Sequence, residues 1–285
     1  MNPLEKGALY VVGTPIGNLG DFSPRAAETL AQADFIAAED TRVTQKLLSH
    51  LGLHKPLLSY FEHNKLSRGE VILARLREGE TCALVSDAGM PAVSDPGETL
   101  IAACAAENIP VYVVPGPTAA ISALAVSGLP TGRFTFEGFL SMNKRSRREH
   151  LAQVEHETRT MIFYEAPHKL RRTLGDLAKL FGDERKIAVV RELTKIHEEV
   201  WRTTLAEAAA HYREQEPRGE YVLVIAGAET PALAEEFSLE DGVERARELV
   251  EGGSSASEAA KQAAKEMGLK KGEIYRELAG RSGRA

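Results

Sequence analysis

The sequence predicts an α/β protein that ends in a wholly helical tail, and three observations support this prediction. Eight short runs rich in Val, Ile, Leu and aromatic residues recur between residues 8 and 227. They lack the polar–apolar alternation of half-exposed strands, so they are typical of strands covered by helices on both faces. Amphipathic stretches of helical length separate these runs, and no run of this kind follows residue 227. Alternating strands and helices indicate an α/β fold.

The eight strands are expected in two groups of four. The first group is predicted at 8–13, 34–39, 81–86 and 110–115, and the second at 133–139, 160–165, 186–191 and 221–227. Helix start signals lie between them. Ser23 followed by Pro24 suits an N-cap and a first helical turn, and a further helix is predicted from near Asn64 to Gly79.

The grouping of the strands predicts the domain organisation. An N-terminal α/β domain is expected over residues 1–116 and a second α/β domain over 117–230. Residues 231–242 are expected to form a linker, and 238–285 a helical tail that resembles a helix-turn-helix.

The tail carries its own helix signals. Ser255 and Glu258 match a capping box, and Gly268 is expected to end the helix that they open. Another helix is predicted from about Lys271 to Leu278. Ala264, Gly268 and Ile274 fall at the small, turn and buried positions of a helix-turn-helix. The alternative is a helical cap used for packing or dimerisation, since the charge of the tail is nearly balanced.

The composition is that of an ordinary globular chain. Of 285 residues, 43% are hydrophobic and 27% are charged, which excludes a disordered or fibrous protein. The formal net charge of −6 argues against a uniformly basic surface but leaves room for a local basic face. Cys82 and Cys104 lie among apolar residues, and neither a signal peptide nor a membrane span is recognisable. We therefore expect a cytoplasmic protein with no membrane partner.

Three turns that follow predicted strands contain the residue types of a ligand site. Gly13–Asn18 follows the first strand, the Asp- and Pro-rich loop 86–97 follows the third, and Pro115–Ser122 follows the fourth. In a parallel sheet these turns meet at the carboxyl edge of the strands, where ligands bind. The spacings GxxxxGK[ST] and GxGxxG are absent, so neither a phosphate loop nor a Rossmann dinucleotide site is expected.

Seven motifs occur in the order found in tetrapyrrole-methylase-like enzymes. They are VGTPIGNLGD, AAEDTR, SDAGMPAVSDPG, VPGPTAAISAL, FYEAPHK, RELTKIHEE and GEYVLVIAG. The chain looks like the branch called ribosomal RNA small subunit methyltransferase I, which methylates a cytidine 2′-hydroxyl in 16S rRNA. Enzymes of the family that act on tetrapyrroles have a different glycine-rich loop in place of 86–97, which favours the RNA branch. The resemblance implies two α/β/α domains of the tetrapyrrole methylase type, S-adenosylmethionine in the interdomain cleft, and a homodimer.

The resemblance also implies which residues hold the cofactor. The first turn would line the cleft, the loop 86–97 would touch the methionine and ribose portions, and later motifs would complete the site. The residues carried over are Thr14, Pro15, Ile16, Gly17, Asp87, Ala88, Gly89, Ala92, Thr118, Ala119, Glu165 and Gly227.

Methyl transfer to a ribose hydroxyl requires removal of the hydroxyl proton. Glu39, Asp40 and Arg42 follow the second strand at the expected ligand edge, so a carboxylate there is a candidate proton acceptor that Arg42 would orient. The alternative is a carboxylate pair at a helix start that is stabilised by the helix dipole. His168 is a second catalytic candidate. The alternative is that His168 is a structural residue held by hydrogen bonds.

RNA binding is expected on a local basic surface. Residues 142–195 contain thirteen Lys or Arg and eight Asp or Glu, and the densest part is Lys144, Arg145, Arg147 and Arg148. Phosphate contact is the preferred interpretation, and a solvated helix start is the alternative. In the tail the RNA-facing side would carry Lys261, Lys265, Lys270, Lys271 and Arg276.

These observations together predict an S-adenosylmethionine-dependent 2′-O-methyltransferase that acts on 16S rRNA or on the assembled small subunit. The alternatives are a tetrapyrrole C-methyltransferase of the same fold and a non-catalytic RNA-binding assembly factor. No metal is expected, because among the histidines only His50 and His54 have ligand-like spacing and Gly52 lies between them.

Overall fold

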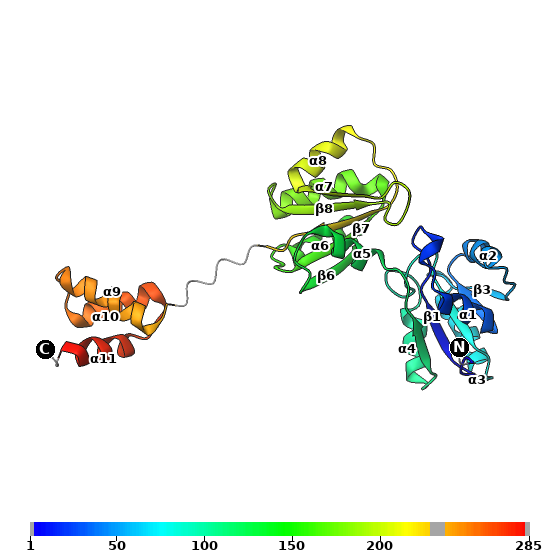
Figure 1. The fold of residues 1–285 in the computed structure, drawn as a ribbon, viewed down its shortest axis with the longest axis horizontal. Helices are drawn as coiled ribbons and strands as arrows, with labels where there is room; N and C mark the ends of the chain where they lie inside the picture. The colour runs from blue at the N-terminus through cyan, green and yellow to red at the C-terminus, as the bar shows by residue number, and fades with distance from the viewer. Residues whose placement is uncertain (1–2, 229–236, 283–285) are drawn as a thin grey trace. The chain divides into compact units, whose positions relative to one another are not determined.

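The computed structural model describes residues 3–228 and 237–282, the side chains of 280–282 excepted. The chain folds into two compact units, Met1–Ala228 and Glu229–Ala285. The first unit contains two five-stranded sheets and the second is helical (Figure 1).

The first sheet is entirely parallel, with the strand order β3-β2-β4-β1-β5. Its strands are β1 (Leu9–Val12), β2 (Phe35–Ala38), β3 (Leu57–Ser59), β4 (Cys82–Val85) and β5 (Val111–Val114). Its helices are α1 (Pro24–Gln32), α2 (Thr41–His50), α3 (Lys65–Arg77) and α4 (Glu98–Ala106), with a short 3-10 turn η1 (Leu19–Asp21). Helices α1 and α2 pack on one face and α3 and α4 on the other, so β1, β2 and β4 are buried on both sides. This double covering explains their unbroken apolar runs.

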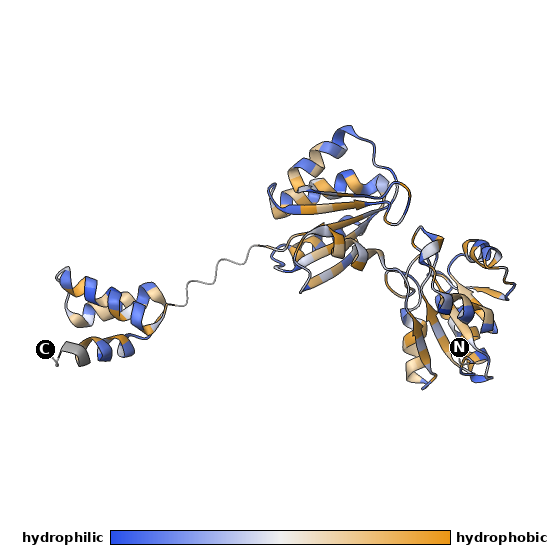
Figure 2. Cartoon of the chain, viewed as in Figure 1, coloured by the Kyte–Doolittle hydropathy of each residue, from blue (hydrophilic) through white to orange (hydrophobic). Residues whose placement is uncertain are grey.

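The second sheet is mixed, with the order β6-β7-β10-β8-β9. Its strands are β6 (Phe134–Phe139), β7 (Thr160–Glu165), β8 (Lys186–Arg191), β9 (Glu199–Thr204) and β10 (Tyr221–Ile225). Strand β10 runs antiparallel to both β7 and β8. Helix α5 (Ala119–Ser127) packs on one face, and α6 (Lys144–Val154), α7 (Pro167–Phe181) and α8 (Leu205–Glu214) on the other. Figure 2 shows apolar residues concentrated along the strands, whereas the helices alternate between apolar and hydrophilic residues.

The α/β prediction is confirmed, and all eight predicted strands are present. Ser23 caps α1 by accepting a hydrogen bond from the Ala26 amide, with Pro24 in the first turn. Strands β3 and β9 were not predicted. The first has only three residues, and the second is an edge strand with the half-exposed sequence EVWRTT, so neither presents an apolar run.

The described part of the tail contains three helices, α9 (Leu239–Glu251), α10 (Ala256–Met267) and α11 (Lys271–Ser282), that pack against one another. The predicted capping box at Ser255 and Glu258 is present, and Gly268 ends α10 in the left-handed conformation. The predicted linker 231–242 extends too far, because Ser238 caps α9 and residues 239–242 form its first turn. Residues 231–236 of that linker lie outside the described residues. Over the described part of the chain, no helix is both long and apolar enough to cross a bilayer.

Candidate active site

The three predicted turns lie together at the carboxyl edge of the first sheet. The backbones of Thr14 and Gly89 form two reciprocal hydrogen bonds of 2.9 and 3.1 Å. The buried Thr14 hydroxyl also donates to the Ser86 carbonyl at 3.2 Å. The turn after β1 is therefore held against the loop 86–97 after β4.

A second set of residues comes from the other sheet. Because β10 is antiparallel to β7 and β8, Tyr221 at its start pairs with Glu165 and Arg191 at their ends. The carboxyl ends of β7 and β8 and the amino end of β10 therefore form one edge. Gly17, in the turn after β1, lies very close to Lys195, which follows β8. A Cβ atom at position 17 would lie only 2.6 Å from Cγ of Lys195. The absence of a side chain at position 17 permits this close approach.

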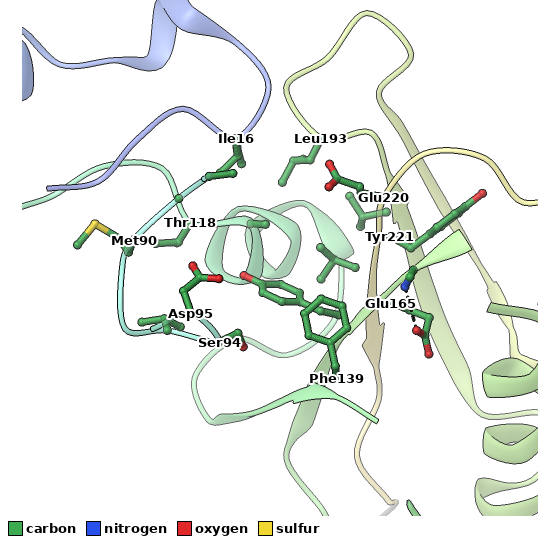
Figure 3. Close-up of a pocket in the computed structure, with 18 of the residues that line it drawn as sticks. Ile16, Met90, Ser94, Asp95, Thr118, Phe139, Glu165, Leu193, Glu220 and Tyr221 are labelled. Atoms are coloured by element: carbon green, nitrogen blue, oxygen red, sulfur yellow. Dashed lines mark hydrogen bonds between the residues drawn. The ribbon is translucent and has the colours of Figure 1, made fainter. Parts of the chain in front are cut away.

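A pocket of about 360 Å³ lies between these two edges (Figure 3), within the range typical of small-molecule sites. Its first wall consists of Ile16, Ala88, Gly89, Met90, Val93, Ser94, Asp95, Thr118 and Ala119. Its second wall consists of Phe139, Tyr164, Glu165, Ala166, Pro167, Val190, Leu193, Lys195, Glu220, Tyr221 and Val222. The lining is mostly apolar, with few polar groups.

Tyr164 connects the pocket to the core of the second sheet. Its ring packs against Phe139 and Phe136, with centroids 5.5 and 5.0 Å away. Its hydroxyl accepts a hydrogen bond of 3.0 Å from the Ala120 amide at the start of α5. The Tyr164 side chain is therefore held in one orientation, by ring packing along its length and by a hydrogen bond at its hydroxyl.

The three carboxylates among the lining residues have different surroundings. Glu165 is buried and accepts hydrogen bonds from the Ala166 amide at 2.9 Å and from the Thr173 hydroxyl. Glu220 is exposed and pairs with Lys195 at 2.7 Å. Asp95 has no cation within salt-bridge distance among the residues described. Burial, followed by the charge of Glu39, raises its pKa to about 6, against a hydrogen bond with Ser86 that lowers it.

The loops on both sides of the pocket contain non-glycine residues in the left-handed conformation. Ala92 and Ser94 have φ values of 68° and 67°, and Glu192 and Thr194 have values of 51° and 66°. Such backbone is unfavourable for residues with a Cβ and persists where the surrounding structure enforces it. Its presence on both sides of one pocket is typical of a functional site.

A buried polar network extends from the pocket floor into the second sheet. The Thr173 hydroxyl donates to Glu165 and accepts a 2.9 Å hydrogen bond from Nη2 of Arg147. Nε of Arg147 donates to Asp176 at 2.8 Å. The Arg147 side chain is only 4% exposed, so this cation belongs to the core.

Comparison with known proteins places this architecture in a family. The model for tetrapyrrole (corrin/porphyrin) methylases matches residues 8–209, which include both sheets up to β9. The chain belongs to the tetrapyrrole methylase family. A solved structure of the uroporphyrin-III-C-methyltransferase from Thermus thermophilus has the same fold, with a TM-score of 0.56 and 22% identity over 77% of this chain and 94% of that one.

Two more similar relatives of this tetrapyrrole methylase are both named ribosomal RNA small subunit methyltransferase I. The protein from Synechocystis sp. is 51% identical over 94% of this chain and 96% of its own length. The protein from Thermotoga maritima is 47% identical over 78% of this chain and 100% of its own length. The resemblance drawn from the seven motifs is thus confirmed.

The structure brings most of the expected cofactor residues of this methylase to the same region. Ile16, Ala88, Gly89, Thr118, Ala119 and Glu165 line the pocket. Thr14, Pro15, Gly17 and Asp87 line a neighbouring hollow beside α2. Ala92 lines neither cavity, although it belongs to the loop 86–97, from which other residues line both.

Gly227 must be removed from the expected cofactor residues, because it does not line the pocket. It lies beyond the carboxyl end of β10, where a Cβ would meet the Thr158 carbonyl oxygen at 1.9 Å. Since β10 is antiparallel to β7, this end is opposite to the pocket. Glu220, Tyr221 and Val222 at the other end of the strand line it instead.

The catalytic candidates do not line the pocket either. Asp40 caps α2 and forms an ion pair with Arg42 at 2.6 Å, and the hydrogen bonds from Arg42 lower its pKa to about 2. Burial and the charge of Asp87 raise the pKa of Glu39. His168 is exposed in the first turn of α7. The helix-start alternative therefore describes Asp40 well. Two carboxylates that line the pocket, Asp95 in the loop 86–97 and Glu220 before β10, were not among the candidates.

The basic run is only partly available for RNA. Lys144, Arg145 and Arg148 are exposed on α6, with Arg145 paired to Glu149 at 2.8 Å. Arg147 must be removed from the RNA-binding candidates because it is buried against Thr173 and Asp176. In the tail, Lys270 is exposed, and Nζ of Lys271 lies 3.1 Å from Oγ of Ser257. No cluster of three or more potential ligands is placed for a metal ion within the described ranges.

Proposed function

We propose that the pocket binds S-adenosylmethionine and that this chain methylates the RNA of the small ribosomal subunit. The observation that carries the proposal is the pocket between the two sheet edges, to which the three turns and the later motifs all contribute. The name of the Synechocystis relative, at 51% identity, supports the RNA substrate. The finer assignment, the 2′-hydroxyl of a cytidine in 16S rRNA, rests on the resemblance of the motifs.

The lining residues fit this cofactor. Val190, Leu193 and Val222 supply apolar surface that suits an adenine ring. Gly89 lines the pocket without a side chain, and its φ of 83° favours glycine. The buried Thr194 hydroxyl, beside the position of Gly17, has no hydrogen-bond partner in the described structure.

When bound, S-adenosylmethionine supplies a methyl group activated by the positive charge on sulfur. The residues of the chain have three tasks: to orient a ribose hydroxyl, to exclude water and to accept a proton. The aromatic wall of Phe139 and Tyr164 and the loop 86–97 restrict the space from two sides. This arrangement favours methyl transfer from S-adenosylmethionine to a ribose hydroxyl, because both would be held in a fixed relative orientation.

A groove between α6 and α7 supports RNA contact beside the pocket. Lys144, Arg148, Arg172 and Lys179 contribute to its lining, together with Asp176 and Glu155. Helix α6 follows β6, whose last residue, Phe139, lines the pocket. Phosphate groups of an RNA strand in this groove would meet the exposed cations close to the reaction site.

The tail is proposed to add RNA affinity rather than chemistry. The Thermotoga relative is also named ribosomal RNA small subunit methyltransferase I but is matched over its full length by 78% of this chain. A protein of that length accommodates the α/β unit and leaves little room for a tail. Lys270 and Lys271 remain the proposed RNA contacts at the start of α11.

Incubation with labelled S-adenosylmethionine tests the function. Label is expected in isolated small subunits, in the 2′-O-methyl form, and not in a tetrapyrrole precursor. Label in the precursor alone would identify a C-methyltransferase, and RNA binding without turnover would identify an assembly factor. The proposed cytoplasmic location and homodimer are tested by cell fractionation and by sedimentation of the purified protein.

A further inference from the structure

We propose that Phe61 and His63 form a stacking platform for bases of the RNA strand that flanks the methylated nucleotide. Both residues belong to the turn 60–64 between β3 and α3, which lines neither the pocket nor the hollow beside α2. The inference rests on the proposed function, because RNA is the partner that it assumes. It adds a surface that holds the substrate strand beside the pocket.

The turn 60–64 lies at the ligand edge of the first sheet. Ser59 at the end of β3 and Val85 at the end of β4 both pair with Ala38 of β2, so the three residues lie level across the sheet. Neighbouring strands are about 4.8 Å apart, which places the end of β3 about 10 Å from the end of β4. A stacked strand advances about 3.4 Å per nucleotide, so about three nucleotides span this distance. The turn is therefore within reach of nucleotides next to a target bound at the loop after β4.

Hydrogen bonds hold the turn 60–64 in one conformation. The Asn64 side chain accepts a hydrogen bond of 2.8 Å from the Phe61 amide and donates one of 3.1 Å to the Ser59 carbonyl. The Tyr60 ring at the start of the turn is buried in the core of the first sheet. The exposed side chains of the turn are thus presented by backbone that RNA binding need not order, which lowers the entropic cost of binding.

Two aromatic rings of the turn are open to solvent. Phe61 is 37% exposed, and His63 is also exposed. Their ring centroids are 6.1 Å apart and their planes meet at 79°. An edge-to-face pair uses a face of only one ring, so ring faces remain free for a base. Proteins recognise unpaired RNA bases by stacking them on side chains such as Phe and His.

Cations accompany these rings. Arg68, early in α3, is exposed, and among the residues described no carboxylate lies within salt-bridge distance of it. Arg42, at the start of α2, is 86% exposed although it pairs with Asp40. Lys65 is paired with Glu62 at 2.6 Å and is less available. Aromatic rings for bases combined with cations for phosphates are typical of single-strand binding surfaces, which favours RNA over an apolar protein partner.

The double variant Phe61→Ala/His63→Ala tests the platform. Its matched control, Phe134→Ala/His54→Ala, removes the same two residue types. Phe134 is 38% exposed at the start of β6 and His54 is exposed before β3, so both lie at strand ends opposite to the ligand edge. The test variant should bind isolated small subunits about 5–150-fold more weakly than the wild type, the range expected for the loss of one base–aromatic stack. The control should bind like the wild type.

Phe61→Trp keeps an aromatic ring and adds a fluorophore at the platform. Titration with a short single-stranded oligoribonucleotide should quench its emission more than that of the wild type, whose Trp201 lies on β9. Phe134→Trp should show no such additional quenching. In turnover, Phe61→Ala/His63→Ala should raise the KM for small subunits and leave both the kcat and the S-adenosylmethionine affinity unchanged. A merely structural role would not produce this combination.

Three results would overturn the platform. They are equal affinities of the two double variants for small subunits, an absence of additional quenching in Phe61→Trp, and altered sedimentation of Phe61→Ala/His63→Ala, which would identify the surface as a contact between copies of the chain. If the wild type leaves small subunits unmethylated, the proposed function fails. The affinity and quenching measurements need no turnover, so they decide on the platform separately.

Discussion

Arg147→Met removes a cation that the sequence places in a basic run and the structure places in the core. The Arg147 guanidinium is the partner of Asp176 and of the Thr173 hydroxyl, which in turn holds the buried Glu165 at the pocket floor. Methionine fills a similar volume but leaves these oxygens without their donor. The pocket floor and the stability of the second sheet should therefore both be affected.

The expected magnitude follows from the burial of the pair. Breaking a buried ion pair by removing one partner costs about 3–5 kcal/mol. Since the Asp176 side chain is 33% exposed and can be partly hydrated, we expect the lower end, about 3 kcal/mol. Arg145→Met is the matched control, because Arg145 is 82% exposed and its pair with Glu149 spans one helical turn. Such surface pairs contribute only about 0.3–0.5 kcal/mol.

Urea unfolding measures this difference. Trp201 is the single tryptophan of the chain and packs against the core cluster beneath α6 and α7, so its fluorescence reports on the affected region. With a slope of about 2–3 kcal/mol per molar urea, the midpoint of Arg147→Met should fall by about 1–1.5 M. Asp176→Asn in the Arg147→Met background should cost less than in the wild type, because the Asp176 carboxylate has then already lost its Arg147 partner and keeps only Arg172, 3.7 Å away. Equal midpoints for Arg147→Met and Arg145→Met would refute the buried-network argument.

The remaining predictions address the cofactor, the RNA and the metal. Gly89→Phe should abolish S-adenosylmethionine binding in calorimetry, since the new side chain would occupy the pocket beside Ile16 and the φ of 83° disfavours a residue with a Cβ; unchanged affinity would remove the pocket assignment. Neutralising Lys144 and Arg148 should weaken binding to small subunits and reduce the slope of log affinity against log salt by about 0.7–0.9 for each phosphate group that is no longer bound; identical slopes would exclude this surface. Deleting the chain from Pro231 onward should weaken that binding further but retain methyl transfer, provided that sedimentation shows the oligomeric state unchanged. Activity should survive EDTA, and loss that one divalent ion restores would contradict the expected metal independence.

Local sequence determined much of this molecule. Eight strands were predictable because each is a short apolar run. Six of them, β1, β2, β4, β7, β8 and β10, are buried over most of their length, as continuous apolar runs suggest, whereas the edge strands β5 and β6 are partly exposed. The caps at Ser23 and Ser255 were predictable because a cap hydrogen bond joins residues only three positions apart. The turns after β1, β4 and β5 could be assigned to one edge because parallel strands place their carboxyl ends together.

Other properties depended on pairing between distant segments, which no local pattern encodes. The antiparallel direction of β10 decided that Tyr221 lines the pocket and Gly227 does not. The packing of α6 on α7 made Arg147 a core residue although its neighbours Arg145 and Arg148 are exposed. The distinction between Asp40 and Asp95 arose in the same way. Arg42, two residues along the chain, stabilises the charge of Asp40, whereas burial in the pocket and the approach of Glu39, 56 positions away in the sequence, destabilise that of Asp95. The sequence identifies which carboxylates are candidates for proton transfer. The proton affinity of each carboxylate depends on its solvation and its neighbours, which only the folded chain defines.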